Sequence, residues 1–183
     1  MRDLRLAHVP EDRLRQGMVA AFQAAETAIL GYQEEAPYCR RYFLDGPAVG
    51  AHCAALMERF DVRPRAPGLR SSSFSGGNQQ KLVLAREMAR EPKVLLVGQP
   101  TRGVDIGAIE FIHREVVKSR DQGCAVLVVS VELEEILSLA DRILVMFAGR
   151  IMGEVTAGRA DERTLGLMMA GAQPALSEAE GQA

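Results

Sequence analysis

The stretch VLLVGQPTRGVD, residues 94–105, has the pattern of a buried strand that leads into a polar turn. In phosphate-handling enzymes such a turn is the usual place for carboxylates that bind a metal ion and activate water. The two residues at the end of the predicted strand are Gly98 and Gln99, and the first acid after them is Asp105. The stretch therefore has the framework of a catalytic turn without its acids.

A second candidate site lies immediately before a predicted helix, at Ser75, Gly76, Gly77, Asn78 and Gln79. Adjacent glycines let the backbone come close to a ligand, and a helix start offers unpaired N–H groups and a positive dipole end. Together these features suit a terminal phosphate. A helix-capping serine followed by a flexible turn would explain the same residues about as well, so the segment alone leaves both interpretations open.

The elements ahead of these segments are predicted to be helical. Residues 13–62 have apolar positions at helical spacing. Residues 61–78 contain prolines, glycines and a serine run, which predicts an extended connector. Residues 79–90 are then predicted to form a helix that ends just before the catalytic-type turn and its strand.

From Pro92 onward, strand and helix patterns alternate. Continuous apolar runs at residues 93–99 and 124–131 predict strands covered on both faces, hence a parallel sheet, with a helix between them. Residues 142–155 are expected to form two strands joined by a turn at Ala148 and Gly149. The sequence thus predicts an α/β fold that is preceded by a helical unit.

Composition narrows the function classes. The chain has 183 residues, and its 22 basic and 24 acidic residues give a net charge of −2 without a broad basic field for nucleic acid. It contains no run of eighteen apolar residues. Cys39, Cys53 and Cys124 have no metal-ligand spacing and are expected to be reduced, mainly buried thiols.

The segment FSGGNQQKLVLAREMAREPKVLLVGQPTRGVD, residues 74–105, closely resembles the signature-to-D-loop segment of ATP-binding cassette (ABC) ATPases. Residues 139–155 resemble the strand pair that closes the same domain, and HVPEDR, residues 8–13, resembles the segment after the phosphate loop in sugar and nucleoside importers. The resemblance covers about residues 5–171. Residues 99–113 look most like the second cassette of double-cassette ATPases for bacterial nucleoside uptake, and less like those for ribose or galactose.

The resemblance implies a C-terminal part of an ABC-type P-loop NTPase domain, with a parallel sheet, helices and an inserted helical subdomain. Residues 1–12 would then be a remnant of the nucleotide-binding core, and residues 13–90 the helical subdomain that ends in the signature helix. Residues 91–171 would form the α/β core, and residues 172–183 a disordered tail.

Four positions depart from the family's catalytic pattern. The family's magnesium-binding Asp and water-activating Glu match Gly98 and Gln99, its switch histidine matches Val131, and its magnesium-sensing glutamine matches Glu11. Gln99 cannot take a proton as a carboxylate would, and the Val131 side chain has no hydrogen-bond donor. No catalytic residue of the family's pattern is therefore expected to be intact, and no metal ligand is expected in the chain.

The phosphate loop is also absent, since none of the three lysines follows a glycine as in GxxxxGK(S/T). The N-terminus is therefore expected to be a cut through a cassette, made either in the gene or in the sequence at hand. The chain alone is expected to be inactive as an ATPase.

In this family two cassettes meet head to tail, and each ATP lies between the phosphate loop of one and the signature of the other. The chain keeps Ser75, Gly76, Gly77, Asn78, Gln79 and Asp105. It is therefore expected to supply the signature to a composite ATP and Mg²⁺ site in a bacterial importer of nucleosides, or of simple sugars. The expected partners are a second cassette and membrane permease subunits, at the cytoplasmic face of the membrane, and no nucleic acid.

Other interpretations stay open. The chain could be a structural or regulatory module that never engages nucleotide, although such a module has no need for SGGNQ. Asp105 could cross to the partner cassette, or cap the helix that begins near Ile106, or do both. Phe74 could stack on adenine, or pack under the helix start.

Overall fold

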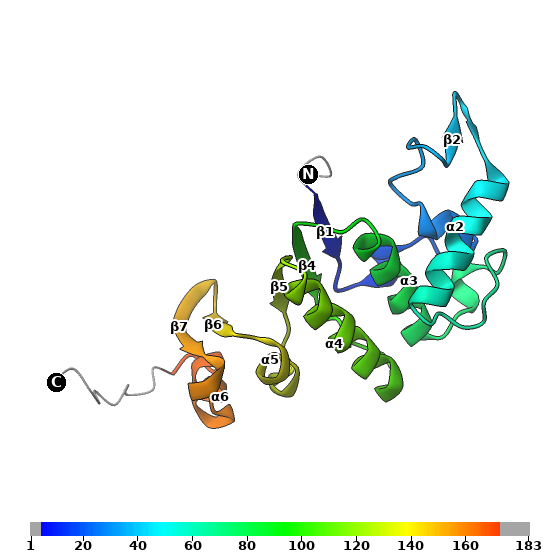
Figure 1. Cartoon of the computed structure of the whole chain (residues 1–183). Helices are drawn as coiled ribbons and strands as arrows, with labels where there is room; N and C mark the ends of the chain where they lie inside the picture. The colour runs from blue at the N-terminus through cyan, green and yellow to red at the C-terminus, as the bar shows by residue number, and fades with distance from the viewer. Residues whose placement is uncertain (1–4, 173–183) are drawn as a thin grey trace. The chain divides into compact units, whose positions relative to one another are not determined.

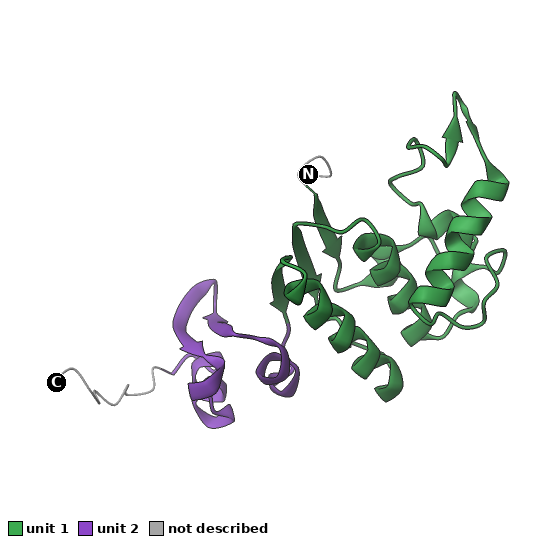
Figure 2. Cartoon of the chain, viewed as in Figure 1, with its two compact units in different colours: residues 1–129 green, residues 130–183 purple. Residues whose placement is uncertain are grey.

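The computed structural model describes residues 5–172, which form two compact units, one up to Val129 and the other from Ser130 (Figure 2). The predicted tail 172–183 lies outside the described residues except for Ala172. The predicted subdomain boundaries at residues 12, 90 and 171 stay a prediction. No helix among the described residues is long and apolar enough to cross a membrane.

The described part of the first unit contains one parallel sheet, four α-helices, two short helical turns and a small hairpin (Figure 1). Its elements are β1 (Leu6–Val9), the π-helical turn η2 (Arg13–Gly17), α1 (Ala24–Ala28), β2 (Cys39–Arg40), β3 (Phe43–Leu44), α2 (Gly46–Arg59), the 3₁₀ turn η3 (Ser71–Ser73), α3 (Gly76–Met88), β4 (Val94–Gly98), α4 (Ile106–Asp121) and β5 (Ala125–Val129).

The predicted parallel sheet is confirmed, with strand order β1-β4-β5. Ala7 and Val9 of β1 alternate with exposed or half-exposed neighbours and join Leu95 and Val97 of β4 in the core. Helix α3 packs against β1 and α4, and α4 packs against β5. The prediction that other elements cover both faces of each strand is wrong for β5. No residue of β5 is buried, and Leu127 is 56% exposed.

Residues 13–62 are less helical than predicted. Their described part includes the short helix α1, the hairpin β2–β3 and only one long helix, α2. Gly31 adopts a φ of 86°, which suits glycine and interrupts helical geometry. Pro37 disfavours helical backbone at the residue before it. Periodic apolar residues were thus outweighed by local backbone breakers.

Helix α3 begins three residues earlier than predicted, at Gly76, and ends at Met88. The earlier start follows from Ser75, whose hydroxyl caps the first turn. Leu82, Val83, Leu84 and Ala85 are all fully buried, so α3 is surrounded by other elements of its unit on more than one side. It is therefore a rigid support for whatever its first turn presents.

The second unit contains α5 (Leu133–Leu139), β6 (Arg142–Phe147), β7 (Arg150–Thr156), the 3₁₀ turn η4 (Ala157–Arg159) and α6 (Glu162–Met169). Strands β6 and β7 pair antiparallel, as predicted, and the turn residues Ala148 and Gly149 have φ values of 47° and 77°. Leu165 and Met168 of α6 pack with Ile143 and Val145 of β6 in a small separate core.

The three cysteines are free, as predicted. Cys53 and Cys124 are buried, and Cys39 is half-buried. Burial raises the pKa of the Cys53 thiol to about 12, so it stays protonated and unreactive at neutral pH.

Candidate functional site

The first turn of α3 is capped by a short hydrogen-bond relay. The Ser75 hydroxyl accepts from the Asn78 side-chain amide at 2.9 Å and from the Asn78 backbone N–H at 3.4 Å. The Asn78 side-chain oxygen accepts from the Arg63 backbone N–H at 2.7 Å. Ser75 is exposed and Gly76 half-exposed. A serine hydroxyl that accepts still has its own proton to donate, so the helix start can offer this proton to an anion.

Atoms of the chain itself pack closely beside the two glycines. A Cβ atom on Gly76 would lie 2.6 Å from an Arg13 guanidinium nitrogen and 2.6 Å from the Gly103 carbonyl oxygen. Gly77 is buried, and a Cβ there would lie 2.9 Å from the Ala108 Cβ and against the Asp105 carboxylate. Close packing within the protein is therefore one reason for glycine at both positions, and their approach to a ligand stays a prediction.

Gln79 points inward. It is 7% exposed, accepts a hydrogen bond from Arg13 Nε at 3.3 Å and donates one to the Ser71 carbonyl at 3.2 Å. The Ser71 hydroxyl in turn pairs with Thr27 Oγ1 at 2.8 Å. The Gln79 side chain therefore fixes the helix within the unit and does not lie on the surface with Ser75. Phe74 is also buried in the core of the unit.

Asp105 lies beside the start of α3. One carboxylate oxygen accepts from the Ala108 N–H at 3.0 Å and caps α4, and the other lies over Gly77. The predicted capping role is therefore present. The residue is exposed as well. The start of α3 and the turn that carries Asp105 thus lie on adjoining segments of the first unit.

The end of β4 has a different character. Gln99 has a φ of 45°, and its N–H donates to the Val129 carbonyl at 2.7 Å. Gly98 faces the loop after β1, because a Cβ on Gly98 would lie 3.1 Å from the Glu11 backbone nitrogen. The Glu11 carboxylate forms an ion pair with Arg102. The Glu11 carboxylate beside this place is thus already paired with a cation of the following turn.

No cluster of three or more His, Cys, Asp or Glu residues in the described part of the chain could hold a metal ion. Magnesium prefers oxygen ligands, and Gly98 and Gln99 supply no carboxylate. Val131 lies in the second unit just before α5, where it is 62% exposed.

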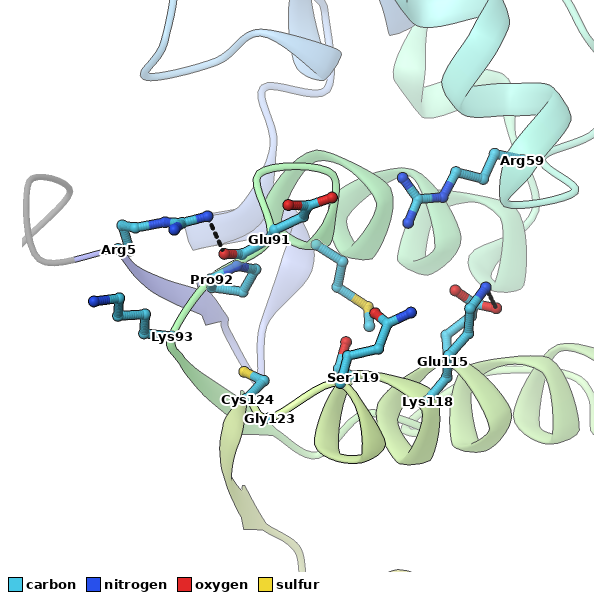
Figure 3. A pocket seen from close by; sticks show the side chains of 12 residues that line it. Arg5, Arg59, Glu91, Pro92, Lys93, Glu115, Lys118, Ser119, Gly123 and Cys124 are labelled. Carbon is cyan, nitrogen blue, oxygen red and sulfur yellow. Dashed lines mark hydrogen bonds and ion pairs between the residues drawn. The ribbon is translucent and has the colours of Figure 1, made fainter.

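A polar pocket lies at the opposite, amino end of β4 (Figure 3). Arg5 donates to the Glu91 carbonyl at 2.7 Å, and Lys118 lies 3.7 Å from Glu115. These cations lie near the ends of α3 and α4, where they complement the negative helix dipoles. Ligands of open α/β sheets bind at the carboxyl ends of the strands, so this pocket is not the candidate site.

Arg13 is the site residue that the sequence did not reveal. Its guanidinium contacts Gln79 of α3 and donates to the Arg102 carbonyl at 2.9 Å and to the Gly103 carbonyl at 3.4 Å. It therefore joins the helix start to the turn that carries Asp105. Its place in the matched HVPEDR segment was the available signal, but one sequence gives no means to see which loop it reaches.

Known proteins are similar to this chain over most of its length. No protein-family model matches the chain. It is 46% identical over 166 residues to a nucleoside import ATP-binding protein, NupA, of Lactococcus lactis, an alignment that covers 91% of the chain and 33% of the relative. It is 42% identical to a guanosine import ATP-binding protein of Bacillus subtilis, covering 91% of the chain and 32% of the relative.

A ribose import ATP-binding protein of Rubrobacter xylanophilus is 43% identical, over 80% of the chain and 28% of the relative. The chain thus spans about a third of the length of these relatives.

Solved structures show the same fold. A dimeric ATP-binding cassette in a post-hydrolysis state, bound to ADP and phosphate, has a TM-score of 0.67 at 20% identity, covering 83% of this chain and 62% of the other. A nucleotide-free cassette from an ABC transporter has a TM-score of 0.65 at 20% identity, covering 84% and 63%. The chain therefore has the α/β fold of an ATP-binding cassette and is a homologue of the ATP-binding proteins of ABC importers.

Proposed function

We propose that the chain is part of the ATP-hydrolysing, energy-coupling subunit of a bacterial ABC importer, in which it supplies the signature segment to a composite ATP site. The carrying observation is the contrast between two places in one unit. The start of α3 presents the exposed Ser75, with the Asp105 carboxylate against Gly77 of the same turn, whereas Gly98 and Gln99 provide no acid at the end of β4. Such a chain donates to a partner's site while its own catalytic site is degenerate.

The cofactors of the proposed assembly are ATP and Mg²⁺. The Ser75 hydroxyl and the N–H groups of the first turn of α3 are the groups here that suit a phosphate. The Mg²⁺ ligands and the phosphate loop would come from the partner cassette. Further partners would be membrane permease subunits, which place the protein peripherally at the cytoplasmic face of the membrane.

Nucleosides are the proposed class of cargo, with simple sugars such as ribose or galactose as the runner-up. Support comes from the two relatives named for nucleoside or guanosine import, which align over 91% of the chain. The ribose-import relative aligns over 80%.

A structural or regulatory module that does not engage nucleotide is the second candidate. One observation favours it, because packing against Arg13, Gly103, Asp105 and Ala108 is enough to require Gly76 and Gly77. Packing of the two glycines does not explain the exposed position of Ser75 at the start of α3. The two candidates differ in whether that surface matters for ATP turnover.

A hybrid protein tests the proposal. In it, this chain replaces the matched third of the Lactococcus nucleoside importer's ATP-binding protein, and uptake of labelled nucleoside is measured in cells that lack the original protein. We expect uptake clearly above that of cells with no ATP-binding protein. A hybrid that assembles with the permease in normal amounts but supports no uptake would contradict the proposal.

Simple sugars, the second class of cargo, are tested with a second hybrid protein. The same replacement in the Rubrobacter ribose importer's protein, with ribose as cargo, should restore less uptake than the nucleoside hybrid does. Greater recovery with ribose would reverse the order of the two cargo classes.

A further inference from the structure

We propose that Arg13 is a positioning residue that locks the turn 99–105 to the start of α3, so that Ser75 and Asp105 are presented as one rigid surface. The inference rests on the proposed function for its consequence in ATP turnover. The lock itself is a property of this chain and can be measured without nucleotide.

Arg13 reaches two elements that are far apart in the sequence. Its Nε donates to the Gln79 side chain at 3.3 Å, and its two terminal nitrogens donate to the Arg102 and Gly103 carbonyls at 2.9 Å and 3.4 Å. Both carbonyls belong to the turn that ends at Asp105. A planar guanidinium can serve several acceptors at once from a fixed fork, whereas an ammonium group acts as a single point.

The fork is itself held in place. The Asp12 carboxylate accepts from the Leu14 and Arg15 N–H groups, each at 3.1 Å, and so caps the π-helical turn that carries Arg13. At the other end of this turn, the Gly17 carbonyl accepts from the buried Arg86 of α3 at 2.7 Å. The segment 13–17 is therefore tied to α3 near both ends of the helix.

The neighbouring ion pair acts in the same direction. Glu11 pairs with the Arg102 side chain, while Arg13 binds the Arg102 carbonyl. Glu11 lies at the position where the family has a magnesium-sensing glutamine. In this chain its carboxylate instead holds the same turn through Arg102. Gly76 completes the arrangement, since any side chain there would displace the Arg13 guanidinium or the Gly103 carbonyl.

Hydrogen exchange on the whole chain tests the lock. The Arg102 N–H donates to the Gln99 carbonyl at 3.1 Å and the Val104 N–H to the Thr101 carbonyl at 3.2 Å, so these amides report on the turn. Arg13→Gln should speed their exchange at least tenfold while amides of α2 keep their rates. Arg13→Lys, which can satisfy one carbonyl, should give an intermediate rate.

Arg15→Gln is the matched control, because Arg15 is exposed on the same π-helical turn and the substitution removes the same charge. It should leave all rates unchanged. Unchanged exchange at Arg102 and Val104 in Arg13→Gln would overturn the inference. So would faster exchange across the whole unit, which would indicate general destabilisation.

ATP turnover in the hybrid importer gives the second arm. Arg13→Gln should lower kcat at least tenfold with little change in the KM for ATP, Arg13→Lys should recover part of it, and Arg15→Gln should have no effect. A loosened turn with normal turnover would overturn the functional consequence of the lock. The proposed function is tested separately by comparing hybrids that carry Ser75→Asp or Ser75→Asn, which differ in charge at that position. A loosened turn in Arg13→Gln, together with equal ATP turnover of these two hybrids, would contradict the proposed function and leave the lock standing.

Discussion

At the start of α3, Ser75 is exposed and its hydroxyl caps the first turn, and the Asp105 carboxylate lies against Gly77 in the same turn. At the end of β4, Gly98 lies against the Glu11 backbone and Gln99 occupies the left-handed region, with no carboxylate at either position. Both places belong to the same unit and are connected through the turn 99–105. The comparison teaches that the absence of carboxylates at one end of this turn need not loosen the packing at its other end.

The first prediction concerns carboxylates introduced at the end of β4. The Gly98→Asp and Gln99→Glu double variant of the isolated chain should show no Mg²⁺-dependent ATP hydrolysis, because the chain has no phosphate loop to hold the nucleotide. Micromolar ATP affinity would correspond to about −8 kcal/mol. Phosphate release above a buffer blank, or micromolar binding by calorimetry, would show that the nucleotide site has been misplaced.

The packing of Gly77 gives the next largest effect. Gly77→Ala places a methyl group 2.9 Å from the Ala108 Cβ and against the Asp105 carboxylate, so α3 and α4 must move apart. Overpacking of this kind costs about 1–3 kcal/mol, and each kcal/mol lowers Tm by about 2–4 °C in a protein of this size. Thermal melting of the chain measures the loss.

Gly50→Ala is the control for this prediction. Gly50 lies in α2 with nothing within 4 Å of an added Cβ, so alanine should be neutral or stabilise by about 0.5–1 kcal/mol. Equal melting temperatures for the two variants would mean that the close contact at Gly77 is wrong. An acid at Gly77 would likewise disturb packing, so it cannot serve as a clean test of phosphate binding.

The smallest expected effect is a pH dependence of stability at His52, which lies neither at the start of α3 nor at the end of β4. His52 Nε2 lies 3.2 Å from the Tyr38 hydroxyl, and burial, aided by the Arg90 charge, lowers the pKa of His52. The neutral His52 side chain contributes its full stabilisation above the ordinary pKa near 6.5. This stabilisation declines as pH falls toward the lower pKa of the folded state, because the unfolded chain binds the proton more readily.

Melting of the first unit at pH 7.5 and 5.5 measures this effect. His52→Gln should show a smaller loss between the two values than the unaltered chain. An identical loss would assign the acid sensitivity to other groups.

The sequence predicted the parallel strands and the closing hairpin well, because continuous apolar runs and the turn at Ala148 and Gly149 are local signals. It predicted residues 13–45 poorly, since the hairpin β2–β3 depends on backbone breakers that apolar spacing does not weigh. The exposure of β5 was missed for another reason. An apolar run indicates that a strand has faces to bury, but it does not show which element packs on them.

The site was predicted in outline only. Local spacing placed Ser75 at a helix start and Asp105 at a cap, and the structure brings the two segments together. The inward direction of Gln79, the burial of Gly77 and the reach of Arg13 to residues about ninety positions away depend on tertiary packing. A single sequence contains no local signal for such contacts.

Charge at Ser75 tests the central claim most directly. Asp and Asn are both good capping residues of similar size, so Ser75→Asp and Ser75→Asn should keep the fold and differ only in charge at the exposed helix start. Like charges a few ångströms apart cost several kcal/mol at intermediate dielectric, and a loss of about 1.4 kcal/mol is already tenfold in rate. In the hybrid importer, ATP turnover of Ser75→Asp should be at least tenfold below that of Ser75→Asn, while Gln99→Ala stays near the unaltered rate. Equal turnover of the two Ser75 variants, at equal melting temperatures, would contradict the account.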